Sequence, residues 1–460
     1  MHLDGANHQV PFLGAGRLAE HATDGAASLH SSQQPRDRLT TARFRHCQVE
    51  PRCRDPHLCF MIEGVPHAPE RTFRRLVWTM AVASGATVPN LYYNQPLLPE
   101  IARSFSASLH AVGLVPTLTQ VGYGLGMLLV VPLGDARERR SLVVACIGAV
   151  SVALLAIALS PNLPWLLAAS LAMGMATCVP QILVPLAANL APPGERGRAV
   201  GTVMSGLLSG ILLSRTLSGF LGAAWGWRAM YLVAAALMIA LAIALRIELP
   251  RSEAHSQLRY LPLLRSLGEL VKSEPALRLH AALGALTFAA FSAFWATLAL
   301  HLRALPAHYG PRTAGAYGAV GLLGALAAPL VGKSAEARGD RRINAIATLA
   351  ILASFAVLWS SGDSLWGLGA GCILLDFGVQ ANHISNQTRI FALREGARSR
   401  LNTVYMVTYF TGGALGAYAG ALAFSAAGWS GVCAVGAACA AAALAILAVA
   451  RPRQPTAAVA

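Results

Sequence analysis

The chain contains 460 residues, of which 55% are hydrophobic and only 12% charged, and its formal net charge is +15. A soluble domain carries about 25% charged residues, so the composition excludes an ordinary soluble protein and predicts a membrane protein. The positive charge does not indicate nucleic-acid binding, because it comes from arginines in short connections between apolar stretches, with no basic patch interleaved with aromatic residues.

The first 70 residues are polar and rich in His, Arg, Pro, Ser and Gln. They show neither periodicity nor the charged-then-apolar pattern of a signal peptide. We expect a disordered N-terminal extension over 1–70, with Met61 as an alternative start. Three of the eight cysteines, Cys47, Cys53 and Cys59, lie in this segment, and their spacing matches no zinc site.

From residue 74 onward, apolar runs of about 20 residues recur, and each is long enough to cross a hydrocarbon core of about 30 Å. Backbone inside lipid must hydrogen-bond to itself, so the runs predict helices. The predicted membrane spans are 76–98, 110–134, 141–160, 164–190, 199–223, 227–247, 278–302, 312–334, 343–361, 365–392, 401–424 and 428–450.

Alternate connections between these spans differ in their arginine content, which predicts the orientation. The segment 71–75, before the first span, and every second connection after it hold most of the Arg and Lys. The other connections hold little beyond Arg103, Arg228, Arg303 and Arg312. The basic connections are therefore expected on the cytoplasmic side of the membrane, with both termini inside.

Three pairs of motifs recur at one interval of 202 residues: Arg139-Arg140 with Arg341-Arg342, Arg196 and Arg198 with Arg398 and Arg400, and Gly226-Trp227 with Gly428-Trp429. The sequence therefore predicts an all-α membrane protein of twelve transmembrane helices in two pseudo-symmetric halves, 71–247 and 278–450. The linker 248–277 is amphipathic and is expected on the cytoplasmic surface, followed at the end by a cytoplasmic tail, 451–460.

Two loop motifs carry a family resemblance. The segment VPLGDARERR (Val131–Arg140) resembles the loop pattern of the major facilitator superfamily, and GKSAEARGDRR (Gly332–Arg342) is similar to its second copy. The resemblance implies that two six-helix halves rock about a central site, which helices 1, 4, 7 and 10 line. It also implies gating roles for four residues in these loops: Asp135, Arg139, Arg140 and Glu336.

Three further segments, at 90–102, 226–238 and 378–393, are similar to a bacterial subgroup described as arabinose-efflux-like or drug-efflux-like permeases. This resemblance implies export of a small organic molecule.

A polar stripe interrupts the apolar span 365–392. Asp376, Gln380, His383 and Gln387 are spaced so that they share one helix face. A carboxylate near the middle of a membrane helix costs about 3 kcal/mol on insertion scales, so we expect it to face a watery cavity. We expect Asp376, and His383 with it, to carry the coupled proton, while Gln380 and Gln387 line the cavity. A static hydrogen-bonded network is the alternative.

Other polar and aromatic residues on the lining helices are candidates for contact with substrate. Asn90, Tyr93 and Asn94 share a helix face by their spacing and could hydrogen-bond a polar substrate; an aromatic belt at the membrane surface is the alternative. Gln181 lies between two prolines on the fourth span. Phe291 and Trp295 on the seventh span could face an aromatic substrate, or could instead face lipid or a neighbouring helix.

Arg215 lies deep in the fifth span beside a stripe of small residues. An unpaired guanidinium is implausible there. Its expected partners are a carboxylate such as Asp376 or helix-end carbonyls, unless the side chain extends to the outer surface; we include it among the gating residues.

No phosphate-binding loop, metal-ligand cluster or nucleophile–base pair is found in the sequence. We therefore expect no enzyme activity, no cofactor and no metal, and the chain is expected to act as a monomer in the bilayer with protons and a small-molecule substrate as partners. Proton-coupled efflux is the first interpretation. An uptake symporter and, in another class, a non-transporting membrane receptor or scaffold are the alternatives.

Overall fold

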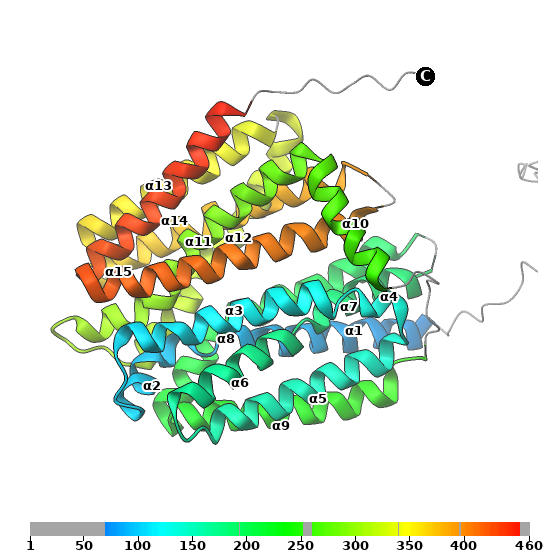
Figure 1. Cartoon of the computed structure of the whole chain (residues 1–460), viewed down its shortest axis with the longest axis horizontal. Helices are drawn as coiled ribbons and strands as arrows, with labels where there is room; N and C mark the ends of the chain where they lie inside the picture. Colours follow the sequence, from blue (N-terminus) through cyan, green and yellow to red (C-terminus); the bar gives the residue numbers. More distant parts are fainter. Residues whose placement is uncertain (1–69, 193, 252–259, 339, 395–396, 451–460) are drawn as a thin grey trace, which may run out of the picture. The chain divides into compact units, whose positions relative to one another are not determined.

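A computed structural model of the chain describes residues 70–192, 194–251, 260–338, 340–394 and 397–450, and within these ranges the chain forms helices and turns without strands. The predicted extension 1–70 and tail 451–460 therefore lie outside the described residues, apart from Glu70. The first half contains α1 (Glu70–Thr87), the 3-10 turns η2 (Val88–Leu91) and η3 (Gln95–Leu97), α2 (Leu98–Ser104), α3 (Leu109–Leu129), α4 (Leu133–Ala136), α5 (Arg139–Ala158), α6 (Leu163–Ala176), α7 (Val179–Leu190), α8 (Arg196–Trp225) and α9 (Trp227–Glu248) (Figure 1). After α10 (Tyr260–Ser273), the second half contains α11 (Pro275–Ala304), α12 (Pro311–Arg338), α13 (Asp340–Ser361), α14 (Leu365–Phe391) and α15 (Arg398–Val449).

The described helices account for the twelve predicted spans. Eight segments are apolar and long enough to cross a membrane: α3, α5, α6 with α7, α8, α9, α11, α13 and α15. The helices α1, α12 and α14 supply three more, and α15 counts twice because Gly428 has a non-helical conformation inside it. The fold is the two-halved, twelve-helix arrangement that the repeat predicts.

The first span is shorter as a regular helix than the sequence predicts. The prediction placed one helix over 76–98, but α1 ends at Thr87 and the chain continues as η2 and η3. Pro89 and Pro96 explain the difference, because each lies in the first turn of one of these 3-10 segments and lacks the N–H that an α-helix needs. The fourth span is broken in the same way ahead of Pro180, between α6 and α7.

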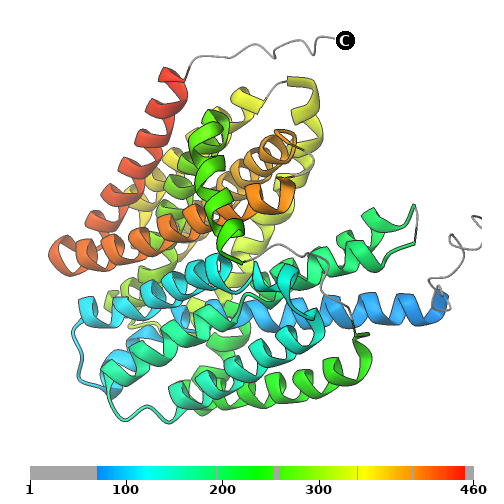
Figure 2. The ribbon, with the colours of Figure 1, turned by 45° about the vertical axis from the view of Figure 1, so that its right-hand side comes forward.

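Matching residues in the two halves repeat the same local structure. Gly226 (φ 85°) and Gly428 (φ 62°) take the left-handed backbone conformation that favours glycine. The tryptophan after each glycine then donates its indole N–H at 2.9 Å, Trp227 to Ser104 Oγ and Trp429 to the carbonyl of Leu358. Figure 2 shows the resulting bend in α15 between its orange first arm and its red last arm.

Contacts between helix ends gather many of the arginines at one end of the bundle, which we call the basic end. There the start of α1 meets the end of α9 through the Arg75–Glu248 ion pair, at 2.5 Å. Arg140 at the start of α5 donates to the carbonyl of Arg246, and Arg341 at the start of α13 donates to the carbonyl of Leu447 at 2.7 Å.

The predicted amphipathic linker contains α10, which spans the two halves at the basic end. Tyr260 donates its hydroxyl to the carbonyl of Leu129 at the end of α3, 2.8 Å away. Just after α10, Glu274 forms an ion pair with Arg394 at 2.6 Å. The linker helix is therefore held by both halves.

At the end opposite the basic end, the halves pack backbone against backbone. A side chain at Gly219 of α8 would lie 2.7 Å from Gly315 Cα of α12, and Thr216 donates its hydroxyl to the carbonyl of Gly315 at 3.0 Å. On the other pair of helices, Gly113 of α3 has no room for a side chain because Ala421 of α15 lies against it. Small residues therefore close this end of the interface between the halves.

Candidate functional site

Arg215 is at the centre of a buried polar cluster between the two halves. Its side chain extends from α8 and is only 2% exposed. The guanidinium Nε donates to Gln95 Oε1 of η3 at 2.6 Å, whereas Nη2 is buried and has no hydrogen-bond partner among the described residues. One strong donor is thus left free in the interior.

Three aromatic rings surround the same guanidinium. Its Cζ lies 4.0 Å from the ring centre of Trp295, 4.9 Å from that of Tyr92 and 5.5 Å from that of Phe291. Cation–π contacts of this kind are worth about 2 kcal/mol or more when desolvated. The rings offset part of the cost of burying a permanent charge, and they come from both halves, since Tyr92 follows η2 and the other two belong to α11.

Asp376 faces this cluster from α14 and is 4% exposed. Cys372 Sγ lies 3.7 Å from its Oδ2, and Gly321 of α12 provides room, because a Cβ there would lie 3.1 Å from the carboxyl group. Arg215 and Trp295 both interact with the carboxyl electrostatically, but neither of these described residues forms a direct ion pair or a well-aligned hydrogen bond with it. We call Tyr92, Gln95, Arg215, Phe291, Trp295 and Asp376 the central cluster.

The structure shows which of the alternatives predicted for the Arg215 side chain it adopts. The side chain does not extend to the surface, and it meets an amide oxygen, three rings and the field of Asp376. Gln95 was missed as a site residue because the prediction treated 76–98 as one helix. The signal that could have found it is the pair of prolines, Pro89 and Pro96, which ends the helix and turns Gln95 toward α8.

The remaining residues of the α14 stripe lie apart from Asp376. His383 is seven residues away, about 10 Å along the helix, and its Nδ1 makes a 2.9 Å hydrogen bond with the Tyr405 hydroxyl. Gln387 donates to Asn402 Oδ1 at 3.3 Å, and Gln380 is half-buried. The structure therefore does not bring His383 to the carboxyl group whose proton it was expected to share.

Three predicted cavity residues point into the first half instead of the central cluster. Asn90 donates to Met238 Sδ of α9 at 3.6 Å, and Asn94 donates to Thr119 Oγ1 of α3 at 3.4 Å. Tyr93 is 2% exposed in the apolar core of that half. The shared face predicted for them assumed an α-helix that does not continue past Thr87.

Gln181 lies near the basic end. Its Nε2 donates to the Tyr123 hydroxyl at 3.4 Å, and it lines a small hollow together with Arg139 and Ser399. This hollow joins α5 and α7 of the first half to the start of α15.

The predicted gating residues are described only in part. Arg139 is buried and donates from Nε to the carbonyl of Gly134 at 3.0 Å, and Arg140 contacts the carbonyl of Arg246. The side chains of Asp135 and Glu336 are not among those that the structure describes, so their gating roles stay predictions.

A second buried polar network lies on the other face of α14, and the sequence reading missed it. Asn386 Oδ1 accepts hydrogen bonds from Asn344 of α13 at 3.1 Å and contacts His280 Nδ1 of α11 at 2.8 Å. Asn386 also donates to Asn382 Oδ1 at 2.7 Å. The asparagines four residues apart were a visible signal, but the Asp376 stripe beside them was taken as the polar face.

No group of three or more His, Cys, Asp or Glu side chains that could hold a metal ion occurs in the part of the chain that the structure describes. The central cluster can instead exchange protons at one carboxyl group and donate hydrogen bonds from a permanent cation, beside aromatic surfaces.

Comparisons with known proteins agree with the twelve-helix fold. The family model described as Major Facilitator Superfamily matches residues 80–393. The putative uncharacterized transporter YgaY of Escherichia coli K12 is 41% identical over 362 residues, which cover 79% of this chain and 92% of the relative. The probable transporter SCO4007 of Streptomyces coelicolor is 34% identical over 378 residues, covering 82% and 87%.

Solved structures show the same fold. A bacterial homolog of the human lysosomal transporter Spinster, in an inward-facing and unoccupied conformation, has a TM-score of 0.62 at 15% identity, with 83% of this chain and 96% of that chain covered. The nucleoside transporter NupG has a TM-score of 0.65 at 11% identity, with 82% and 100% covered. At such identities the similarity is one of fold alone.

Proposed function

Because the chain belongs to the major facilitator superfamily, and is therefore a multi-pass membrane transporter, we propose that it exports a small organic molecule in exchange for protons. Asp376 is the proposed proton carrier, and the molecule is drug-like or sugar-like. The single observation that supports this role is the buried carboxyl group beside Arg215, an arginine that stays charged.

Two opposing effects act on the protonation state of the Asp376 carboxyl group. The positive field of Arg215 favours the ionised form, while burial favours the neutral form, and no direct ion pair between these two described residues fixes either one. Carboxyl groups inside membrane bundles commonly mark proton pathways. A proton can therefore bind and leave without dismantling a salt bridge.

Competition between the proton and the substrate would produce exchange. A substrate hydroxyl can donate to ionised Asp376, while a substrate oxygen accepts from the free Nη2 of Arg215. The rings of Tyr92, Phe291 and Trp295 offer flat apolar contact. Protonation of Asp376 removes the negative charge and adds an O–H donor, which weakens the hydrogen bond from the substrate hydroxyl. Proton and substrate therefore bind the cluster in competition.

Alternating access would expose this cluster to one side at a time. The small-residue contacts of α8 with α12 and of α3 with α15 close the end opposite the basic end. With the basic end on the cytoplasmic side of the inner membrane, as the arginine distribution favours, the closed end is the outer one. We propose that the chain works in this orientation, with both termini inside, as a monomer.

The direction of transport is testable once a substrate is found. Strains that overexpress or lack the gene are compared for growth across a compound panel, and the compounds that separate them are added to proteoliposomes containing the purified protein and a pH-sensitive dye inside. Under exchange, a compound added outside enters as protons leave, so the interior becomes more alkaline. An interior that becomes more acidic indicates uptake together with protons, the second candidate function. Flux that is absent for every such compound contradicts both.

A further inference from the structure

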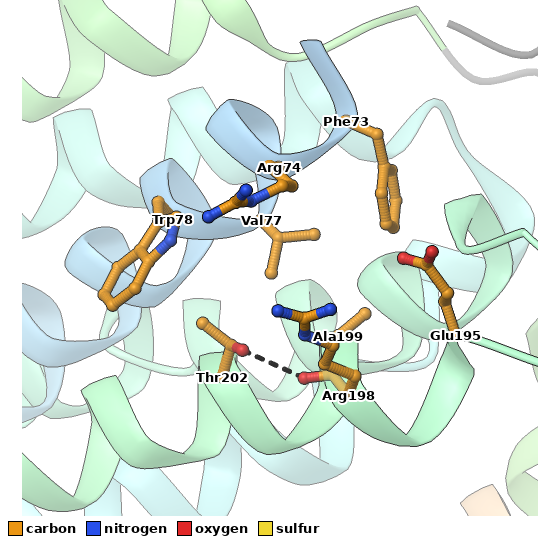
Figure 3. Close-up of a pocket in the computed structure, with 8 residues that line it drawn as sticks. All are labelled: Phe73, Arg74, Val77, Trp78, Glu195, Arg198, Ala199 and Thr202. Atoms are coloured by element: carbon orange, nitrogen blue, oxygen red, sulfur yellow. Dashed lines mark hydrogen bonds between the residues drawn. The ribbon is translucent and has the colours of Figure 1, made fainter. Parts of the chain in front are cut away.

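A hollow at the basic end lies between α1 and α8, outside the central cluster. Figure 3 shows the side chains that line it: Phe73, Arg74, Val77, Trp78, Glu195, Arg198, Ala199 and Thr202. The hollow exists because the two helices touch closely farther along. A side chain at Gly206 would meet the backbone of Ala81, and one at Gly210 would meet the backbone of Gly85. Toward their starts the hollow separates the two helices.

Two arginines, one from each helix, supply the charge of this hollow. Arg74 and Arg198 are exposed, and neither side chain makes a hydrogen bond or ion pair with another described residue. Their neighbour Arg75 differs, since it forms the ion pair with Glu248. Figure 3 shows both guanidinium groups between Trp78 and Glu195. With the Glu195 carboxylate counted, the three groups leave one net positive charge.

One side of the hollow is apolar and continues along α1 toward Trp78 and Val82. Phe73, Val77 and Ala199 are buried along it. Trp78 and Val82, one helical turn apart on α1, are each 61% exposed. A tryptophan in this position is typical of the boundary between headgroups and acyl chains. The occupant must therefore join an anionic group to an apolar chain.

We propose that this hollow binds a monoanionic phospholipid of the phosphatidylglycerol type. Its phosphate lies between Arg74 and Arg198, and an acyl chain follows Val77 and Trp78 toward Val82. The single negative charge matches the net charge of the hollow. Free phosphate would satisfy the arginines but would leave the apolar wall uncovered. Basic pockets between membrane helices on the cytoplasmic side bind anionic headgroups by the same physics. The bound lipid would bridge the starts of α1 and α8.

The test measures lipid retention on the purified full-length protein. Protein in detergent is mixed with phosphatidylglycerol or phosphatidylcholine of the same chain length, and bound lipid is counted by native mass spectrometry. Each arginine near a headgroup contributes about fivefold to affinity. Phosphatidylglycerol should therefore bind about 25-fold more weakly to the double variant Arg74→Gln/Arg198→Gln than to the unchanged protein, while phosphatidylcholine binding stays the same.

The control is Arg251→Gln/Arg265→Gln, which removes two exposed arginines elsewhere in the basic connections and should keep the preference for phosphatidylglycerol. If the double variant does not stay monodisperse, Arg74→Gln alone should weaken binding about fivefold. Equal binding of the two lipids by the unchanged protein, or equal loss in the control variant, overturns the proposal. So does inorganic phosphate that displaces the lipid at matched concentration, since the site would then recognise only an anion. None of these outcomes depends on Asp376 or on transport.

Discussion

The guanidinium of Arg215 on α8 lies 4.0 Å from the ring centre of Trp295 on α11, and this contact joins the first six helices to the last six inside the protein. The same guanidinium holds Gln95 of the first half and interacts with Asp376 of the second. A charged group thus bridges the two halves, beside polar contacts such as that of Ser292 with Gln120 and the close contacts between small residues. Any movement of the halves must change its surroundings.

The first prediction concerns this bridge. Arg215→Met should lower the free energy of unfolding by about 3 kcal/mol, because removal of one member of a buried charged cluster leaves the other charge uncompensated. The double variant Arg215→Met/Asp376→Asn should recover part of that loss. The measurement is thermal unfolding in detergent, analysed as a double-mutant cycle. Arg312→Met, which removes an exposed arginine, is the matched control and should have little effect. Strictly additive losses for the two substitutions would show that the charges do not interact.

The sequence predicted the fold well, because membrane burial leaves strong signals. Apolar runs of fixed length, arginines in alternate connections and the glycine–tryptophan pairs all reflect constraints that act locally. The same reading named Asp376, Arg215, Phe291 and Trp295, and the structure places these four together. Asp376 and Arg215 could be named because a charged residue stands out inside an apolar span.

The errors come from features that only the folded chain settles. Asn90, Tyr93 and Asn94 were placed on one helix face, but two prolines change the helix geometry and turn them into the first half. The helix α14 has two polar faces, and the spacing of its residues does not show which of them is directed at the first half. Asp376 faces Arg215, whereas Asn382 and Asn386 face α11 and α13. Distances across the interface depend on packing between segments that are far apart in the sequence.

The network around Asn386 gives the second prediction. Asn386→Leu should destabilise the protein by about 1–3 kcal/mol, because it leaves His280 and Asn344 buried without their shared acceptor. Gln387→Leu, at the next position on α14, removes one long and partly exposed hydrogen bond and should cost much less. Thermal unfolding of both variants in the same detergent compares them. Equal melting temperatures for the two would contradict a structural role for the network.

The third prediction tests whether the end opposite the basic end must close. Leucine at Gly219 would collide with the backbone of Pro311 and Gly315, so Gly219→Leu should favour conformations in which α8 and α12 separate there. Spin labels at positions 225 and 310, attached to a background without other reactive cysteines, should then report a longer distance. Gly148→Leu on α5, where a Cβ meets nothing within 4 Å, should leave the distance unchanged. An unchanged distribution in Gly219→Leu would show that this contact does not control closure.

The paired glycines allow a fourth prediction about folding alone. Gly226 and Gly428 have positive φ and open space around the position of a Cβ, so alanine there tests backbone conformation without a clash. Each Gly→Ala substitution should cost about 1–3 kcal/mol of stability, because positive φ with extended ψ is a conformation that essentially only glycine adopts. Gly148→Ala, in a regular helix, should be neutral or slightly stabilising. Melting temperatures that do not fall for either paired glycine would contradict the strained turn assigned to the repeat.

Asp376→Asn provides the most direct test of the proposed coupling, since it keeps the shape of the side chain and removes its ability to exchange a proton. The measurement is the substrate-dependent pH change inside proteoliposomes, made with a compound from the resistance panel and with Asp363→Asn, an exposed acid in the turn before α14, as the matched control. The account predicts that Asp376→Asn abolishes the pH change while the protein stays folded and Asp363→Asn retains it. A full pH change in Asp376→Asn would contradict the central claim.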